Sequence, residues 1–147
     1  PVFALVEVRS GGRAVPAEGA ALGAGGARMT PRVVLVEDEP LVSMMMQDLL
    51  TDLGCEIVAA FGALEPALAW LSRQETPPHG AVLDVNLGGG ETVFPLAEAL
   101  RARGVPFVFA TGYGVLPSDG YPDTPLLSKP VNQDQLLPVV RAFAALA

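Results

Sequence analysis

Short apolar runs alternate with segments of helical periodicity from Pro31 to the end of the chain, and this alternation constrains the fold more than any other feature. Runs such as RVVLV (32–36) and AVLDV (81–85) are continuously apolar, as expected for strands that are buried on both faces. The segments between such runs carry leucines at helical spacing. Strands that alternate with helices through short loops predict a parallel sheet with right-handed crossovers. We therefore expect an α/β domain.

The expected elements follow one another without an internal repeat. Strands are expected at 32–36, 55–61, 81–85, 105–111 and 125–129, and helices at 40–53, 63–74, 91–103 and 131–146. One face of the first helix carries Leu41, Met45, Leu49 and Leu53, and the second helix is expected to turn Leu64, Leu68 and Leu71 inward. Pro95 lies inside the third helical segment, so the helix either starts near it or is kinked there.

Residues 1–30 differ in composition from the rest of the chain. After PVFALVEV, which alternates enough to be the last strand of a preceding domain, the sequence consists mainly of Gly, Ala, Arg and Pro. This composition is typical of a linker. We expect residues 1–30 to be an N-terminal extension and residues 31–147 to be the folded domain, with Met29 as a possible natural start.

Composition and charge exclude several classes of function. The net charge of −7 argues against general nucleic-acid binding, which needs a basic face. No apolar run is long enough to span a bilayer, so we expect no membrane partner, and the single cysteine favours a reducing compartment such as the cytoplasm. The single cysteine, Cys55, excludes an internal disulfide framework and is expected to be a small buried hydrophobe. The single histidine, His79, is expected to be a solvent-facing loop residue.

Four of the expected strands end in chemically active side chains. Glu37 and Asp38 follow the first strand, Asp84 ends the third, Thr111 ends the fourth and Lys129 ends the fifth. In a parallel sheet these side chains would meet at the carboxyl edge, where ligands bind in open α/β folds. The combination predicts a site for a divalent cation and a phosphoryl group.

The three acids among these residues favour a cation. Glu37, Asp38 and Asp84 would repel one another at the sheet edge, and hard oxygen ligands suit Mg²⁺ better than zinc or copper. Asp38 or Glu39 alone could simply cap the helix that begins at Pro40. That interpretation fits Glu39 well, but it does not account for Asp84 on a buried strand.

Asp84 can also act as a nucleophile. A carboxylate that attacks phosphorus forms an acyl phosphate. Lys129 would then hold one phosphoryl oxygen as a point charge, and Thr111 would donate its hydroxyl to another. The glycines at 88–90 lack the lysine of a P-loop and are better explained as a tight turn.

The segments VLVEDEP, LDVNLGGGET, FVFATGYG and LLSKP resemble the receiver domain of two-component response regulators over residues 31–147. The resemblance implies a flavodoxin-like sheet of strand order 2-1-3-4-5. It also implies that Asp84 is the phosphoacceptor, Glu37 and Asp38 the acidic pocket and Thr111 the switch hydroxyl. Lys129 would be the phosphoryl partner before a cis Pro130, and the backbone carbonyl of Asn86 a further metal ligand.

The PFVFATGYG string further resembles the FATGY-motif subgroup of receivers, which occur alone or fused to sensor kinases. Two departures from the family pattern stand out. Leu126 occupies the position three before the lysine where the family usually has an aromatic residue, and a Pro-rich segment, 112–125, replaces the fourth helix. We expect that helix to be shortened or missing. Our hypothesis is that Tyr113 and this loop transmit the signal instead.

The expected function is that of a signalling phosphoacceptor rather than an enzyme. The resemblance implies phosphorylation by a histidine kinase or a histidine phosphotransfer protein, slow self-dephosphorylation and output through a downstream protein partner. The chain would be a stand-alone regulator or part of a hybrid kinase. A rival is an aspartyl-nucleophile phosphohydrolase, but Asn86 stands where such enzymes carry a second Asp. A flavin or nucleotide binder would need a phosphate loop where this chain has Glu37-Asp38-Glu39.

Overall fold

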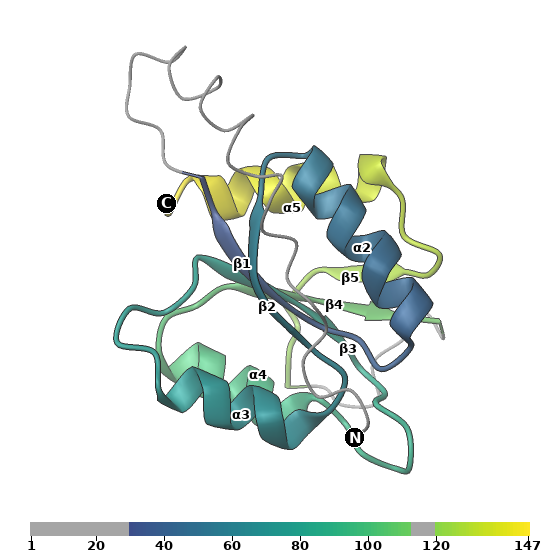
Figure 1. Cartoon of the computed structure of the whole chain (residues 1–147), viewed down its shortest axis with the longest axis vertical. Helices are drawn as coiled ribbons and strands as arrows, with labels where there is room; N and C mark the ends of the chain where they lie inside the picture. The colour runs from purple at the N-terminus through teal and green to yellow at the C-terminus, as the bar shows by residue number, and fades with distance from the viewer. Residues whose placement is uncertain (1–29, 113–119) are drawn as a thin grey trace.

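The computed structural model describes residues 30–112 and 120–147, which form a parallel sheet between two layers of helices (Figure 1). The strands are β1 (Arg32–Val36), β2 (Glu56–Phe61), β3 (Gly80–Asp84), β4 (Phe107–Thr111) and β5 (Leu126–Ser128). The helices are α2 (Pro40–Asp52), α3 (Leu64–Ser72), α4 (Phe94–Ala102) and α5 (Gln133–Ala144). The sheet has the order β2-β1-β3-β4-β5 and every neighbouring pair is parallel, which confirms the predicted flavodoxin-like fold.

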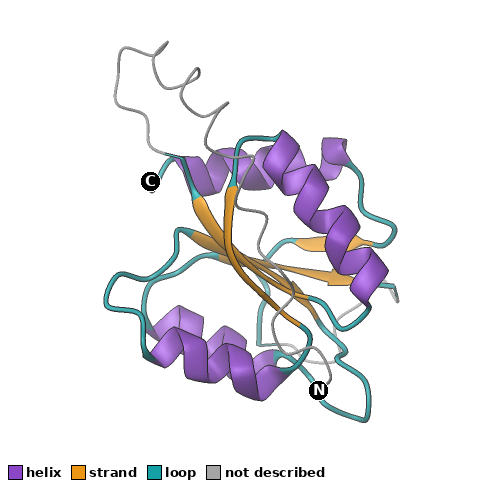
Figure 2. Cartoon of the chain, in the orientation of Figure 1, coloured by secondary structure: helices purple, strands orange, loops and turns teal. Residues whose placement is uncertain are grey.

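The apolar strands are covered on both faces, as their sequences require. Helices α2 and α5 lie on one face of the sheet, and α3 and α4 lie on the other (Figure 2). Alternate residues of each strand therefore enter different cores: Val33 and Leu35 pack with α2 and α5, whereas Val34 and Val36 pack with α3 and α4. The two cores hold the carboxyl ends of the strands in fixed register.

The helix ends follow from local chemistry. Pro40 and Pro95 lie in the first turns of α2 and α4, where a missing N–H costs nothing. Helix α4 thus starts next to Pro95 and is not kinked there. Gly104 follows the end of α4 with a φ of 74°, a left-handed conformation that favours glycine. Helix α5 opens with a capping box between Asn132 and Gln135.

The buried face of α2 differs from the stripe that leucine spacing indicates. The buried residues are Ser43, Met46, Gln47 and Leu50. Leu41 and Met45 are 75% and 59% exposed, whereas Leu49 and Leu53 pack partly buried against the core, so only the second half of the expected stripe meets the sheet. Gln47 donates to the Ser43 hydroxyl within the buried face, which lets two polar residues occupy core positions. In α3 the inward residues Leu64 and Leu71 are buried as expected, and Leu68 is half-buried against them.

The connection between β4 and β5 contains no helix among its described residues, 112 and 120–125. Residues 113–119, and with them Tyr113, lie outside the described part of the chain, as do residues 1–29. Tyr121 packs into the core on the α3–α4 side of the sheet. In the described residues no helix is long and apolar enough to cross a membrane.

The lone cysteine and histidine have clear structural roles. Cys55 is buried and free, and burial raises the pKa of its thiol to about 12, so it stays protonated, as predicted for a small hydrophobe. His79 is not simply solvent-facing, contrary to expectation. Its Nδ1 accepts a hydrogen bond of 2.8 Å from the Arg32 backbone N–H, and the backbone N–H of His79 donates to the Arg32 carbonyl, so side chain and backbone of His79 together fix the start of β1.

Candidate functional site

The sheet brings the predicted polar residues together at its carboxyl edge. Glu37 directly follows β1, Asp84 is the last residue of β3, Thr111 is the last residue of β4 and Lys129 directly follows β5. Parallel strands in the order β1-β3-β4-β5 place all four strand ends side by side. The convergence that strand-end chemistry predicts is therefore present in the fold.

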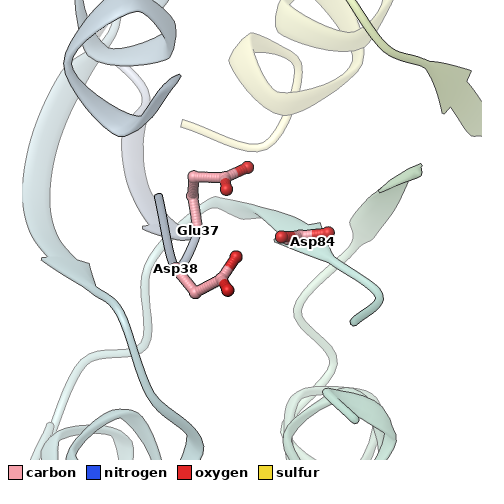
Figure 3. Close-up of side chains that lie close together, drawn as sticks. All are labelled: Glu37, Asp38 and Asp84. Carbon is pink, nitrogen blue, oxygen red and sulfur yellow. The ribbon is translucent and has the colours of Figure 1, made fainter. Parts of the chain in front are cut away.

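Three carboxylates form the centre of the site. Glu37, Asp38 and Asp84 each offer one oxygen, and these oxygens all lie within 4.8 Å of one another. Figure 3 shows Glu37 and Asp38 leaving the end of β1 toward Asp84 at the end of β3. Glu37 and Asp84 are only 2% and 6% exposed, whereas Asp38 is half-buried. Few clusters of acids this buried persist without a compensating charge.

Lys129 supplies part of that charge. Its Nζ lies 2.8 Å from Glu37 Oε1 and 3.2 Å from Asp84 Oδ2. The second oxygen of Glu37 accepts a hydrogen bond from the Glu39 N–H, so Glu37 is held at both oxygens. Lys129 is itself placed by its backbone N–H, which donates to the Thr111 carbonyl at 3.0 Å. The ammonium thus bridges the ends of β1 and β3 from the end of β5.

The side chains of the site carry more negative than positive charge. Burial first and the Glu37 charge second raise the pKa of Asp84 to about 8, because Lys129 offsets only part of their effect. Burial by itself would lower the pKa of Lys129, but its contacts with Glu37 and Asp84 outweigh burial and raise it. Three carboxylates face one ammonium here, which leaves an excess of two negative charges when all four groups are ionised.

The donor set fits a hard divalent cation. All three side chains offer carboxylate oxygens, which Mg²⁺ and Ca²⁺ prefer, and no cysteine or histidine belongs to the cluster among the described residues. A cation between the three oxygens would neutralise the excess negative charge. The pattern of charge and the chemistry of the ligands therefore agree with the expected Mg²⁺ site.

The remaining predicted residues lie around this centre. Thr111 is buried at the end of β4. Asn86 is exposed two residues beyond Asp84, where it forms an isolated bridge with Thr92 at the base of the glycine turn. The peptide bond between Lys129 and Pro130 is cis, as expected from the resemblance.

One feature of the site was not predicted from the sequence. A cavity of about 330 Å³ adjoins the acidic cluster between α2 and the residues after β5. Its walls are mostly apolar, with Met45, Met46 and Leu49 on one side and Val131 on the other, while Asp84 and Lys129 line it as well. The run of three methionines at 44–46 could have indicated this region, because flexible thioether side chains often line adaptable surfaces.

Solved structures decide the family. The chain is 40% identical to SdrG from Sphingomonas melonis Fr1, covers 96% of that chain with 78% of its own length and superposes with a TM-score of 0.66. It is 27% identical to the REC domain of the PhyR response regulator from Erythrobacter litoralis, with 92% of that chain and 80% of this one covered and a TM-score of 0.68. The chain belongs to the response regulator receiver family.

Further comparisons agree with this receiver fold. A response regulator receiver protein from Sinorhizobium medicae WSM419 has a TM-score of 0.68 over 79% of this receiver and 95% of that chain, and its 24% identity bears on the fold alone. SdrG has also been solved in a BeF3-activated conformation, with the same 40% identity to this receiver. No protein-family model and no curated protein sequence matches this receiver. Membership of the FATGY-motif subgroup stays a prediction.

Proposed function

We propose that this receiver stores a phosphoryl group on Asp84 as part of a two-component or phosphorelay system. The observation that carries the proposal is the joint placement of three carboxylates within 4.8 Å of one another and a lysine in contact with two of them. In this proposal residues 31–147 are the receiver domain and residues 1–30 an extension.

The proposed transfer uses Asp84 as the nucleophile. One carboxylate oxygen attacks phosphorus, the bond from phosphorus to the donor's histidine nitrogen breaks, and the imidazole leaves with the electron pair. The Lys129 ammonium, 3.2 Å from Asp84 Oδ2, is placed to hold a phosphoryl oxygen. Thr111, at the end of the neighbouring strand β4, would donate its hydroxyl to another.

Glu37, Asp38, Asp84 and the Asn86 backbone carbonyl would hold Mg²⁺. When bound, the cation supplies positive charge that offsets the repulsion between the carboxylates and the incoming phosphoryl group. Contacts within the chain position the carboxylates: the Glu39 N–H and Lys129 hold Glu37, and the buried end of β3 holds Asp84.

The proposed partners are proteins. A histidine kinase or a histidine phosphotransfer protein would deliver the phosphoryl group in the cytoplasm, and a downstream protein would bind the phosphorylated receiver. The charge of −7 supports protein partners over nucleic acid. The structural relatives include a PhyR described as an anti-anti-sigma factor, which is consistent with output through protein contacts in this fold.

Incubation with acetyl phosphate tests the proposed site directly. We expect wild-type protein to gain one phosphoryl group in the presence of Mg²⁺, seen as a mass increase in intact-protein mass spectrometry. It should gain none when the metal is chelated during the incubation. Asp84→Asn should gain none. The matched control, Asp123→Asn, changes an exposed aspartate away from the cluster and should label like wild type.

Two results would contradict the proposal. Phosphate on Asp84→Asn, or labelling that ignores Mg²⁺, would show that the acidic cluster is not the acceptor. Steady turnover of unrelated phosphate esters by the wild-type protein would instead support a phosphohydrolase.

A further inference from the structure

Tyr121 is buried although it lies outside any helix or strand, in the segment that leads into β5. Its ring stacks on Phe94 of α4, with centroids 5.4 Å apart and an interplanar angle of 14°. It also meets Phe109 of β4 edge to face at 5.1 Å and Phe107 at 6.0 Å. Such offset and edge-to-face pairs add to the stability that burial alone provides.

Two charged residues of α4 hold Tyr121 from the outside. The phenol donates a hydrogen bond to the Glu98 carboxylate, and the Arg101 guanidinium lies 4.5 Å from the ring centroid. Arg101 also donates to the Gly120 carbonyl at 3.1 Å. We call these contacts of Gly120 and Tyr121 with Glu98 and Arg101 the Tyr121 clamp. The side chains of Glu98 and Arg101 are at least half exposed, so each polar contact is individually weak and the clamp can open at modest cost.

The aromatic cluster beneath the clamp reaches both strands of the proposed phosphorylation site. Phe109 lies two residues before Thr111 on β4. Phe94 is the first residue of α4, and the N–H of the preceding residue donates to the carbonyl of Val85, which directly follows Asp84. Val85 in turn donates to a carbonyl of β4 at 3.1 Å. Direct contacts therefore connect the ends of both strands to the ring of Tyr121.

Leu126, which pairs with Phe109 in the sheet, has no side-chain group that could form such a clamp. It occupies the position three before Lys129, has neither a ring nor a polar group, and packs half-buried against the same core as Tyr121. The described structure therefore places an aromatic ring with a polar tip at residue 121, next to β4, and a plain aliphatic chain at residue 126.

We propose that Tyr121 is a positioning residue of the Asp84 site, whose contacts with Phe109 and Phe94 couple the loading of Asp84 to opening of the clamp on α4. This inference rests on the proposed phosphoacceptor function. A phosphoryl group held by Asp84, Thr111 and Lys129 shifts the end of β4. Because packed cores hold discrete arrangements rather than deforming smoothly, the shift moves Phe109 and releases Tyr121. By linkage, a weaker clamp favours loading of Asp84.

Fluorine NMR of protein labelled with 3-fluorotyrosine tests this coupling. The chain has two tyrosines, so the spectrum contains two protein signals, and Tyr121→Phe identifies one of them. We expect beryllofluoride with Mg²⁺, a mimic of the phosphoryl group, to move the Tyr121 signal and to increase its shift between H₂O and D₂O, which reports exposure to solvent. Asp84→Asn should show neither change.

The same spectrum separates failure of this inference from failure of the proposed function. The fluorine signal of protein-bound beryllofluoride reports directly whether Asp84 is loaded. If that signal is missing, the proposed phosphoacceptor function is wrong, and this inference falls with it. If that signal is present and the Tyr121 signal does not move, the coupling is refuted while the proposed function stands.

A pair of variants distinguishes a positioning role from a merely structural one. Tyr121→Phe keeps the ring but removes the hydrogen bond to Glu98, which weakens the closed clamp, and should tighten beryllofluoride binding about fivefold. Leu71→Val, which removes a methylene from the core on α3, lowers the stability of the whole domain without touching the clamp. It should leave the affinity unchanged. Equal affinities for wild type and Tyr121→Phe, or equal changes in both variants, would refute the role.

Discussion

Gly80 illustrates how one residue sets the distance between a helix and the sheet. It is the first residue of β3, and a Cβ at this position would lie 2.4–2.5 Å from three ring atoms of Phe143 on α5. We predict that Gly80→Ala lowers the free energy of unfolding by about 1–3 kcal/mol, because overpacking forces the ring or the helix to move. Denaturation by urea measures the effect.

Two companion variants check the cause of that loss. Gly112→Ala adds a methyl group where no atom of the described residues lies within 4 Å and should change stability by less than about 0.5 kcal/mol. Phe143→Leu should remove most of the additional penalty of Gly80→Ala when the two are combined, because the clashing ring is gone. Strictly additive losses would contradict a clash with Phe143.

His79 predicts a pH dependence of stability. Burial and the nearby Arg32 lower the pKa of His79 in the folded state, so the unfolded chain binds a proton more readily. Stability that the neutral imidazole provides is therefore fully present above the unfolded pKa of about 6.5 and is lost as pH falls toward the folded pKa. We expect the unfolding free energy of wild type to fall between about pH 7 and pH 5 more steeply than that of His79→Gln, which cannot titrate. Parallel curves for the two proteins in chemical denaturation would contradict this assignment.

At the residue scale, the sequence predicted the site better than its surroundings. Asp84, Thr111 and Lys129 were predictable because each ends or follows an apolar run, and parallel strands leave only one edge for their side chains. The roles of His79 and Tyr121 were not predictable in this way. Both lie in irregular segments, and their burial depends on partners distant in sequence, Arg32 and the aromatic residues around α4.

Helix α2 shows where periodicity misleads. Its leucine and methionine stripe suggests a core face, but the core takes Ser43 and Gln47, which share one hydrogen bond while Gln47 Oε1 has no partner among the described residues. The displaced apolar residues are left outside: Leu41, Met44 and Met45 are 75%, 52% and 59% exposed. Met45 of this patch also lines the cavity that reaches Asp84, and exposed apolar patches often mark protein interaction sites.

We predict that this patch binds an apolar helix face of the phosphodonor protein. The double variant Leu41→Gln/Met44→Gln keeps residues that suit a helix and should slow transfer from a phosphorylated kinase or phosphotransfer protein about tenfold, as expected for loss of apolar anchors at an interface. Transfer from acetyl phosphate should be unchanged, because a small donor does not use the patch. Both rates are followed by the phosphorylated fraction of receiver against time.

Leu146→Gln is the matched control for the patch. Leu146 is 57% exposed but lies beyond the end of α5. It should leave both rates at the wild-type value. A double variant that slows the two donors equally would show that the substitutions disturb the Asp84 site rather than a docking face.

For the whole molecule, the alternation of strands and helices was enough to predict a parallel sheet, because few other arrangements bury strands that are apolar on both faces. The strand order did not follow from alternation and came from the family resemblance. The local hydrophobic pattern does not indicate which strands are neighbours. The motifs at the strand ends do, because they carry the resemblance to a family whose strand order is known. The cavity beside α2 was not predictable either, because it results from how α2 and the residues after β5 pack against the same sheet face.

The charge balance of the site should limit the stability of the whole domain. Glu37, Asp38 and Asp84 are brought together against their mutual repulsion, and the pKa of Asp84, raised to about 8 first by burial and then by Glu37, shows that the fold disfavours its ionised form. A raised pKa of an acid means that folding stability falls as pH rises from about 4 to 8.

We therefore predict that, without divalent cations at pH 7.5, Asp84→Asn unfolds at higher urea concentration than wild type, with a gain on the order of 1 kcal/mol. Mg²⁺ at one hundred times its dissociation constant should then stabilise wild type by about 2.7 kcal/mol and the variant by much less. The difference in unfolding free energy between the two proteins should therefore shrink or change sign. Asp123→Asn, an exposed aspartate outside the cluster, should behave like wild type in both conditions. If Asp84→Asn is the less stable protein without cations, the carboxylates do not repel one another enough to matter, and the domain does not give up stability to keep the site ready for a cation.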